Sequence, residues 1–117
     1  MNAEQAIHSF WSSFSIPAYD ENSVPDNAAL PYITYSLSYD SFGNDVSMSG
    51  SVWYRSMSWR SVTEKTAEIS EFLGEGGIII DTDNGHIWIK KGHPFYRRIG
   101  QEEIKRIYIN IEAEYFQ

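Results

Sequence analysis

Few residues in this chain have the type and spacing that acid–base or metal chemistry requires. The three histidines are His8, His86 and His93, and none belongs to the i, i+4 pair of a zincin-type helix motif. Asp81 and Asp83 lie in the same region, and His86 or His93 with either carboxylate could form an acid–base pair. Surface and hydrogen-bonding roles explain the same residues, so we expect no catalytic site, no metal site and no cofactor.

Other motif-like stretches are explained by turns and polar strand faces. The run Asp81–Gly85 is similar to the start of a calcium loop, but its glycine comes one position early, and Gly92 stands where a bidentate glutamate is needed. Glu112 and Glu114 could act as paired carboxylates in a hydrolase, although they also suit the polar face of a strand. The chain has no cysteine, which excludes disulfide scaffolds and cysteine nucleophiles.

A stretch that mixes aromatic and basic residues is the strongest candidate for binding. Residues 93–98 read His-Pro-Phe-Tyr-Arg-Arg, and Lys90 and Lys91 come just before them. Aromatic rings beside arginines can anchor protein interfaces or stack nucleic-acid bases, whereas Phe95 could instead fill the core. Core packing and a protein interface both remain open at this point, and nucleic acid ranks third.

The charge of the chain is acidic and unevenly distributed. Nine Lys and Arg stand against 16 Asp and Glu, which gives a formal net charge of −7. Residues 1–54 contain no Lys or Arg, whereas residues 90–106 are rich in both. Phosphate repulsion makes an acidic protein a poor general nucleic-acid binder, so we expect no specific nucleic acid. An acidic face on one copy could instead meet a basic face on the next.

Hydrophobic periodicity predicts two helices and five strands. Apolar residues recur at three- and four-residue spacing in the helices, and they alternate with polar residues in the strands. Gly50 suggests a bulge or a close backbone approach, Ser61 with Glu64 forms a capping-box pattern, and Phe72 belongs to the buried stripe of its helix. The predicted elements are helix 2–14, a loop over 16–30, strands 31–40 and 46–57, helix 61–73, and strands 77–82, 86–91 and 103–116, with a break at Gly92-His93-Pro94.

This order, α-β-β-α-β-β-β, predicts a single domain over residues 1–117. We expect an α+β fold in which both helices pack on one face of a single, mainly antiparallel sheet. Such a two-layer fold cannot bury both faces of the long hairpin, so aromatic residues such as Trp53 and Tyr54 are expected to mark a partner surface. No apolar run is long enough to cross a membrane as a helix, so we expect no membrane partner.

Three phrases in the sequence resemble a known family. They are Pro-Tyr-Ile-Thr-Tyr at residues 31–35, the pattern G-x-I-W-I-x-x-G-x-P-F at residues 85–95, and Lys-Arg-Ile-Tyr-Ile-Asn-Ile-Glu-Ala-Glu-Tyr at residues 105–115. With the order of elements, they resemble the tail-terminator and tail-completion proteins of long-tailed bacteriophages and prophages, which are often labelled minor capsid proteins. The resemblance covers most of the chain in layout.

The resemblance implies structural work in a virion and no catalysis. Proteins of this kind form a ring, typically of six copies, at the head-proximal end of the tail tube, where they end the tube and join it to the head. The implied partners are other copies of the chain in a homo-hexameric ring, the tail tube protein and head–tail connector proteins. The implied location is the tail or neck of the virion, after assembly in the bacterial host cytoplasm.

A ring requires two different matching patches on each copy. The candidate interface residues fall into a hairpin patch, a basic and aromatic segment, and an acidic loop that could face that segment on a neighbour. They are Phe42, Trp53 and Tyr54; Lys90, Lys91, Phe95, Arg97 and Arg98; and Asp20, Glu21 and Asp26.

Three other functions fit the same residues. One is a different head–tail connector, neck or minor capsid protein with the same small fold. Another is a small acidic module that binds a host protein or a basic toxin as an immunity protein does. The third is the acid–base enzyme that the histidines and aspartates would form.

Overall fold

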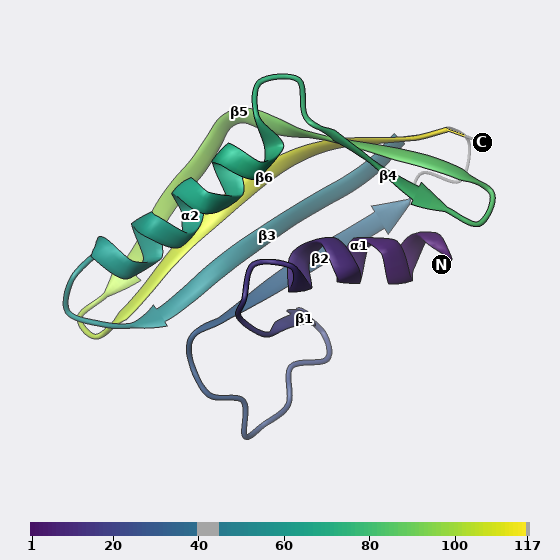
Figure 1. Cartoon of the computed structure of the whole chain (residues 1–117). Coiled ribbons are helices and arrows are strands. Elements are labelled where there is room, and N and C mark those ends of the chain that lie inside the picture. Colours follow the sequence, from purple (N-terminus) through teal and green to yellow (C-terminus); the bar gives the residue numbers. More distant parts are fainter. Residues whose placement is uncertain (40–44, 117) are drawn as a thin grey trace.

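A computed structural model of the chain describes residues 1–39 and 45–116. Figure 1 shows two helices and one six-stranded sheet, which is the predicted α+β class. The strands follow the spatial order β1-β2-β3-β6-β5-β4, and every neighbouring pair is antiparallel except β1 with β2. The elements are α1 (Ala3–Ser12), β1 (Ala18–Asp20), β2 (Tyr32–Tyr39), β3 (Asp45–Arg55), α2 (Arg60–Leu73), β4 (Ile78–Thr82), β5 (Gly85–Gln101) and β6 (Ile104–Phe116).

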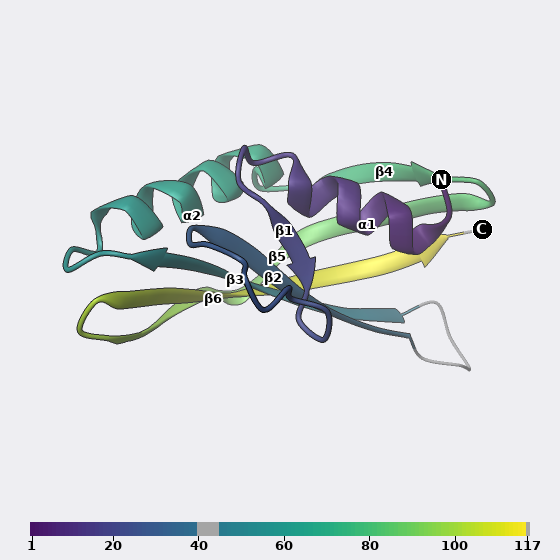
Figure 2. The ribbon, with the colours of Figure 1, turned by 90° about the horizontal axis from the view of Figure 1, so that it is seen from below.

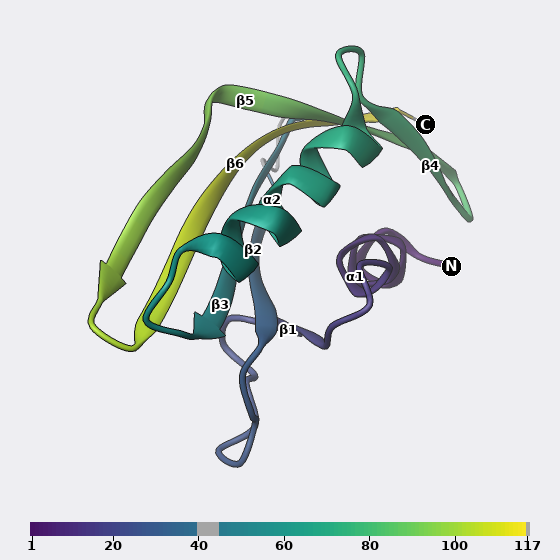
Figure 3. The same cartoon turned by 60° about the vertical axis from the view of Figure 1, so that its left-hand side comes forward.

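Both helices lie on the same face of the sheet, as the sequence predicts. Figures 2 and 3 show α1 and α2 on one side of the strands, with the sheet curling around them as a half-barrel. The core fills the space between the helices and this concave face. Its largest fully buried side chains are Ile7, Trp11, Ile33, Val52, Val62, Ile69, Leu73, Ile87, Ile89, Ile107 and Ile109.

The close approach suggested by Gly50 is present, and the pairing of β3 with its neighbours runs through this glycine without a bulge. The indole ring of Trp11 lies directly against Gly50, so that an ideal Cβ there would be 2.5 Å from Cη2 of Trp11. The ring also stacks on Tyr35, with 6.3 Å between centroids and an interplanar angle of 6°. Gly50 therefore lets α1 dock closely on the sheet.

Two local predictions near the helices are wrong. The segment 16–30 is not entirely a loop, because β1 pairs with β2 there and the Ile33 amide donates to the Pro17 carbonyl at 2.8 Å. Helix α2 begins without a side-chain cap after Trp59, and the Glu64 carboxylate accepts from Arg60 Nε at 3.0 Å instead of forming a capping box. The predicted burial of Phe72 is wrong as well, because its side chain is 51% exposed, although its ring still contacts those of Phe10 and Phe14.

The predicted break at Gly92-His93-Pro94 is also wrong, because β5 continues through it to Gln101. Strand β6 is long enough to pair with both halves of β5, and the extra residues are taken up by a register shift between Lys91 and Tyr96. The Asn110 side-chain amide donates to the Pro94 carbonyl at 2.8 Å, which ties the irregular stretch to β6. Within the described residues, neither helix is long and apolar enough to cross a membrane.

Candidate functional site

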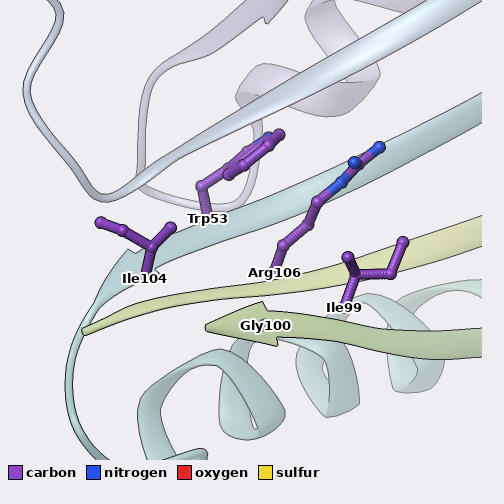
Figure 4. A pocket seen from close by; sticks show the side chains of 5 residues that line it. All are labelled: Trp53, Ile99, Gly100, Ile104 and Arg106. Carbon is purple, nitrogen blue, oxygen red and sulfur yellow. The ribbon is translucent and has the colours of Figure 1, made fainter. Parts of the chain in front are cut away.

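The face of the sheet opposite the helices, here called the helix-free face, carries a compact group of aromatic and basic side chains. Strand pairing sets Trp53 of β3 beside Arg106 of β6, and Arg106 beside Ile99 of β5. Because side chains alternate along each strand, these residues point away from the buried positions next to them. Figure 4 shows Trp53, Arg106 and Ile99 pointing to the same side of three strands, with the green coils of α2 on the other side.

Arg106 is held in place by its neighbours. Its guanidinium carbon lies 4.7 Å from the centre of a Trp53 ring, and its Nε donates to the Ser51 hydroxyl at 2.9 Å. The Trp53 indole N–H in turn donates to the Thr34 hydroxyl at 2.9 Å. Stacking and hydrogen bonding thus fix the planar cation on the surface of the sheet.

A second arginine extends this group along the face. Arg97 lies opposite Tyr108 in the next row of the sheet, and its guanidinium carbon is 5.6 Å from that ring. The Arg106 guanidinium carbon lies 6.0 Å from the same ring. We call Trp53, Arg97, Arg106 and Tyr108 the aromatic–arginine cluster.

A shallow hollow of about 220 Å³ opens beside this cluster. Trp53, Ile99, Ile104, Gly100 and Arg106 line it, so apolar walls surround one fixed cation (Figure 4). Within residues 1–39 and 45–116, the ion pairs of the chain include neither Arg97 nor Arg106. A hollow with this lining can accept an apolar side chain next to a carboxylate.

The opposite end of the helix-free face has the reverse character. There Glu112 lies opposite Lys90, and Glu114 lies opposite Trp88. The Lys90 ammonium is 4.0 Å from the Trp88 ring centre, so it covers that ring. The face therefore runs from a basic, aromatic end to a mixed end that contains two carboxylates.

The structure separates Trp53 from Tyr54, which the sequence grouped as one hairpin patch. Tyr54 points to the helix side and packs against the core. Burial raises the pKa of Tyr54 above its usual 10.0, and the negative charges of Glu68 and Glu64 raise it further. Phe42, the third residue of that patch, lies outside the described residues.

The basic and aromatic segment is divided between the two faces in the same way. Phe95 is partly buried against the core and lines a hollow with Thr63 and Thr66 of α2, so its position is that of a core residue. Arg98 faces the helix side, where its guanidinium carbon is 4.9 Å from the Trp59 ring centre, whereas Arg97 belongs to the helix-free face.

Lys91 stays close to the partly buried end of this segment. Its ammonium lies 5.5 Å from the Phe95 ring centre, whereas Lys90 covers Trp88 on the helix-free face. The two lysines, like the two arginines, therefore do not act as one patch.

Asp20 ends β1, and Glu21 and Asp26 lie on the loop that leaves the body of the protein between β1 and β2. Figures 1 and 3 show this loop protruding beyond the edge of the sheet. The Asn22 amide donates to the Asp20 carboxylate at 2.9 Å, and the Glu21 amide donates to the Tyr35 carbonyl at 2.9 Å, which orders the start of the loop. Glu21 and Asp26 are exposed.

The histidines and aspartates do not assemble into a larger cluster. His86 Nδ1 lies 2.8 Å from the Asp81 carboxylate on the exposed β4–β5 hairpin, and His93 is exposed further along β5. His8 Nδ1 lies 3.0 Å from the Tyr35 hydroxyl. Within the part of the chain that the structure describes, no three His, Asp or Glu side chains are placed to hold a metal ion.

Sequence reasoning missed Arg106, Tyr108, Ile99 and Ile104 as members of a surface site. The alternation of apolar and polar residues in β6 already places Tyr108 on the polar face of the strand. The same alternation places Arg106 on that face. Ile99 and Ile104 carry no comparable signal, because the hollow depends on how β3, β5 and β6 end together.

No protein-family model and no curated protein sequence matches the chain. Among solved structures, the chain is similar to one from the virion of a native gene transfer agent particle, with 15% sequence identity and a TM-score of 0.57. The match covers 97% of this chain and 94% of that chain. At this level of identity the likeness shows a shared fold, and it extends over nearly the whole of both proteins.

Proposed function

We propose that this protein is a structural component of a phage-like virion. The observation that carries the proposal is the shared fold with a chain of a gene transfer agent virion, because the likeness spans nearly all of both chains. A fold alone does not determine function, so the surface of the molecule must also suit assembly. The aromatic–arginine cluster, which is partly exposed on a sheet face without helices, suits a protein interface.

Within the virion, the proposed role is that of a tail terminator or tail-completion protein at the head-proximal end of the tail tube. The sequence phrases at residues 31–35, 85–95 and 105–115 support this role by resemblance. The proposed assembly is a homo-hexameric ring that contacts the tail tube protein and the head–tail connector proteins. A closed ring uses two different patches of each copy, and the cluster and the acidic loop are two such patches of opposite charge.

The proposed role involves no catalysis. The one histidine–carboxylate pair among the described residues, His86 with Asp81, is solvent-exposed on both sides, with side-chain exposures of 59% and 85%. An acid–base pair that performs general catalysis is usually desolvated or held in a cleft, where its pKa values can be tuned. A hydrogen bond on the hairpin explains this pair without further function.

The test is the assembly state of the purified protein, alone and with tail tubes from the particle that encodes it. Size-exclusion chromatography with light scattering over a concentration series should show oligomers, and negative-stain images of the largest species or of capped tubes should show closed rings. Binding to portal or connector complexes but not to tubes would replace the terminator role with that of a neck protein. A strict monomer that binds no virion part, or that forms a one-to-one complex with a host protein, would refute the proposal.

A further inference from the structure

We propose that the acidic loop of one copy, residues 20–30, seats in the hollow beside the aromatic–arginine cluster of the next copy. This inference rests on the proposed function and specifies the contact that would close the ring. The occupant is thus a second copy of this chain, and the chemistry that selects it is a carboxylate beside a small apolar side chain.

The hollow has the composition that such an occupant requires. Ile99, which is 37% exposed, and Ile104 provide apolar surface, and Trp53 provides a flat aromatic wall. Arg106 is already ordered by Trp53 and Ser51, so little side-chain entropy is lost when a partner binds it. Only its Nε is used by Ser51, which leaves the other guanidinium N–H groups to bind a carboxylate with two bonds.

The loop has the complementary composition. Glu21 and Asp26 are exposed, while Val24 and Leu30 are half-buried within the same loop. Within the described residues, the ion pairs of the chain include none of Asp20, Glu21 and Asp26. Backbone bonds from Ser23 N to Asp20 O at 2.9 Å and from Ala28 N to Pro25 O at 3.0 Å give the loop internal order.

The two patches lie at different places on the sheet, which is the condition for a head-to-tail contact. The loop is attached to β1 and β2 at one edge, whereas the hollow lies between β3, β6 and β5. A head-to-tail contact of this kind is heterologous, and it forms a closed ring when the rotation between successive copies closes on itself. A nucleic acid would also be attracted by the arginines, but the net charge of −7 and Glu112 and Glu114 on the same face oppose it.

Disulfide trapping tests this contact directly, since the chain contains no cysteine. We would mix the single variants Asp26→Cys and Ile99→Cys, oxidise them mildly, and follow the formation of the covalent heterodimer. The matched control mixes Asp26→Cys with Glu71→Cys, which places the second thiol on the exposed surface of α2. The expected result is rapid cross-linking of the first pair, and a ladder of oligomers when Asp26→Cys and Ile99→Cys are combined in one chain.

Charge reversal tests the same contact without cross-linking. Arg106→Glu should weaken self-association by about 30-fold or more, as expected when one partner of a desolvated charge pair is reversed. Glu21→Lys with Asp26→Lys should weaken it similarly, and mixing this variant with Arg106→Glu should restore heterologous association. Arg98→Glu serves as the control, because it changes the same charge at the same end of the sheet on the helix side.

The outcomes separate this contact from the proposed function. Cross-linking of the loop–hollow pair no faster than the control overturns the contact, and if rings still form, the virion role survives without it. Binding of a fluorescent single-stranded oligonucleotide that Arg106→Glu abolishes, together with no specific cross-link, also overturns the contact in favour of nucleic acid. Loss of the cross-link together with a strict monomer that binds no virion part overturns both proposals.

Discussion

Replacing Gly50 with alanine should destabilise the protein, because α1 docks on the sheet through the space that a Cβ would fill. An ideal Cβ at this position lies 2.5 Å, 2.8 Å and 3.0 Å from Cη2, Cζ3 and Cζ2 of Trp11. The ring cannot easily move away, since Trp11 is fully buried and stacks on Tyr35, the β2 residue paired with Gly50.

The size of the effect follows from two opposing terms. Extra methyl groups in a packed core cost about 1–3 kcal/mol. Alanine also lowers the conformational entropy of the unfolded chain, which stabilises the folded state by about 0.4–1 kcal/mol where the backbone conformation is allowed. The net loss in the free energy of unfolding is therefore about 1–2 kcal/mol, or a decrease in Tm of roughly 4–8 °C for a domain of this size.

Thermal and urea denaturation followed by circular dichroism would measure this loss. Gly76→Ala is the matched control, because nothing lies within 4 Å of its ideal Cβ and stability should stay equal or rise slightly. Trp11→Phe replaces the indole with a smaller ring and removes an N–H that has no hydrogen-bond partner within the described residues. In the Trp11→Phe protein, Gly50→Ala should therefore lower the free energy of unfolding by less than it does in the wild type. A Gly50→Ala protein as stable as the wild type would refute the reasoning.

Three further predictions concern charge, pH and the sheet edge. Arg97→Glu should weaken self-association measured by light scattering, while Arg98→Glu should not, because only Arg97 lies on the helix-free face. Equal effects of the two substitutions would contradict the placement of these arginines on opposite faces. Burial, followed by the charges of Asp20 and Glu4, raises the pKa of Tyr35 above 10.0, and the pKa of Tyr54 is raised as well. Because these pKa values are raised in the folded state, the stability that the two neutral tyrosines contribute is fully present below about pH 10. It falls as the pH rises through the pKa of the folded state. Tyr35→Phe with Tyr54→Phe should therefore reduce the decrease in urea midpoint at alkaline pH. Ile79, 67% exposed on the edge strand β4, should tolerate lysine within about 0.5 kcal/mol, and turbidity on heating should decrease.

The fold class was predictable because the apolar periods of the chain are strong and local. Ile7, Phe10 and Trp11 are all buried on α1, and the buried alternation of β6 runs through Ile107 and Ile109 as the sequence predicts. Strand β1 was not predictable, since its three residues have no period of their own and are ordered by pairing with β2. Short elements of this kind exist only through tertiary contacts.

The faces of Arg97 and Arg98 show why the site could be predicted only in part. In a regular strand, every second residue after the buried Ile87 would face the helices. This rule would place residue 97 on the helix side and residue 98 on the helix-free face. Between Lys91 and Tyr96, however, β5 advances five residues while its partner positions on β6, Ile111 and Ile109, differ by two. Because the number of extra residues in β5 is odd, the alternation of side chains reverses after the register shift. The shift therefore decides which arginine lies on the same face as Trp53, and no local sequence pattern predicts it.

The sheet topology converts an uneven sequence into an uneven surface. The half of the chain without Lys or Arg supplies β1, β2 and nearly all of β3, whereas the half that holds all nine basic residues, together with ten acidic ones, supplies β4, β5 and β6. Because the spatial order is β1-β2-β3-β6-β5-β4, the two halves occupy opposite sides of one sheet and do not interleave. The acidic edge can therefore attract the arginines of the helix-free face between copies, as the proposed contact requires. In the proposed head-to-tail contact, the loop supplies the carboxylates and the hollow supplies the fixed guanidinium group, so the separation of charge along the sheet sets the direction of association.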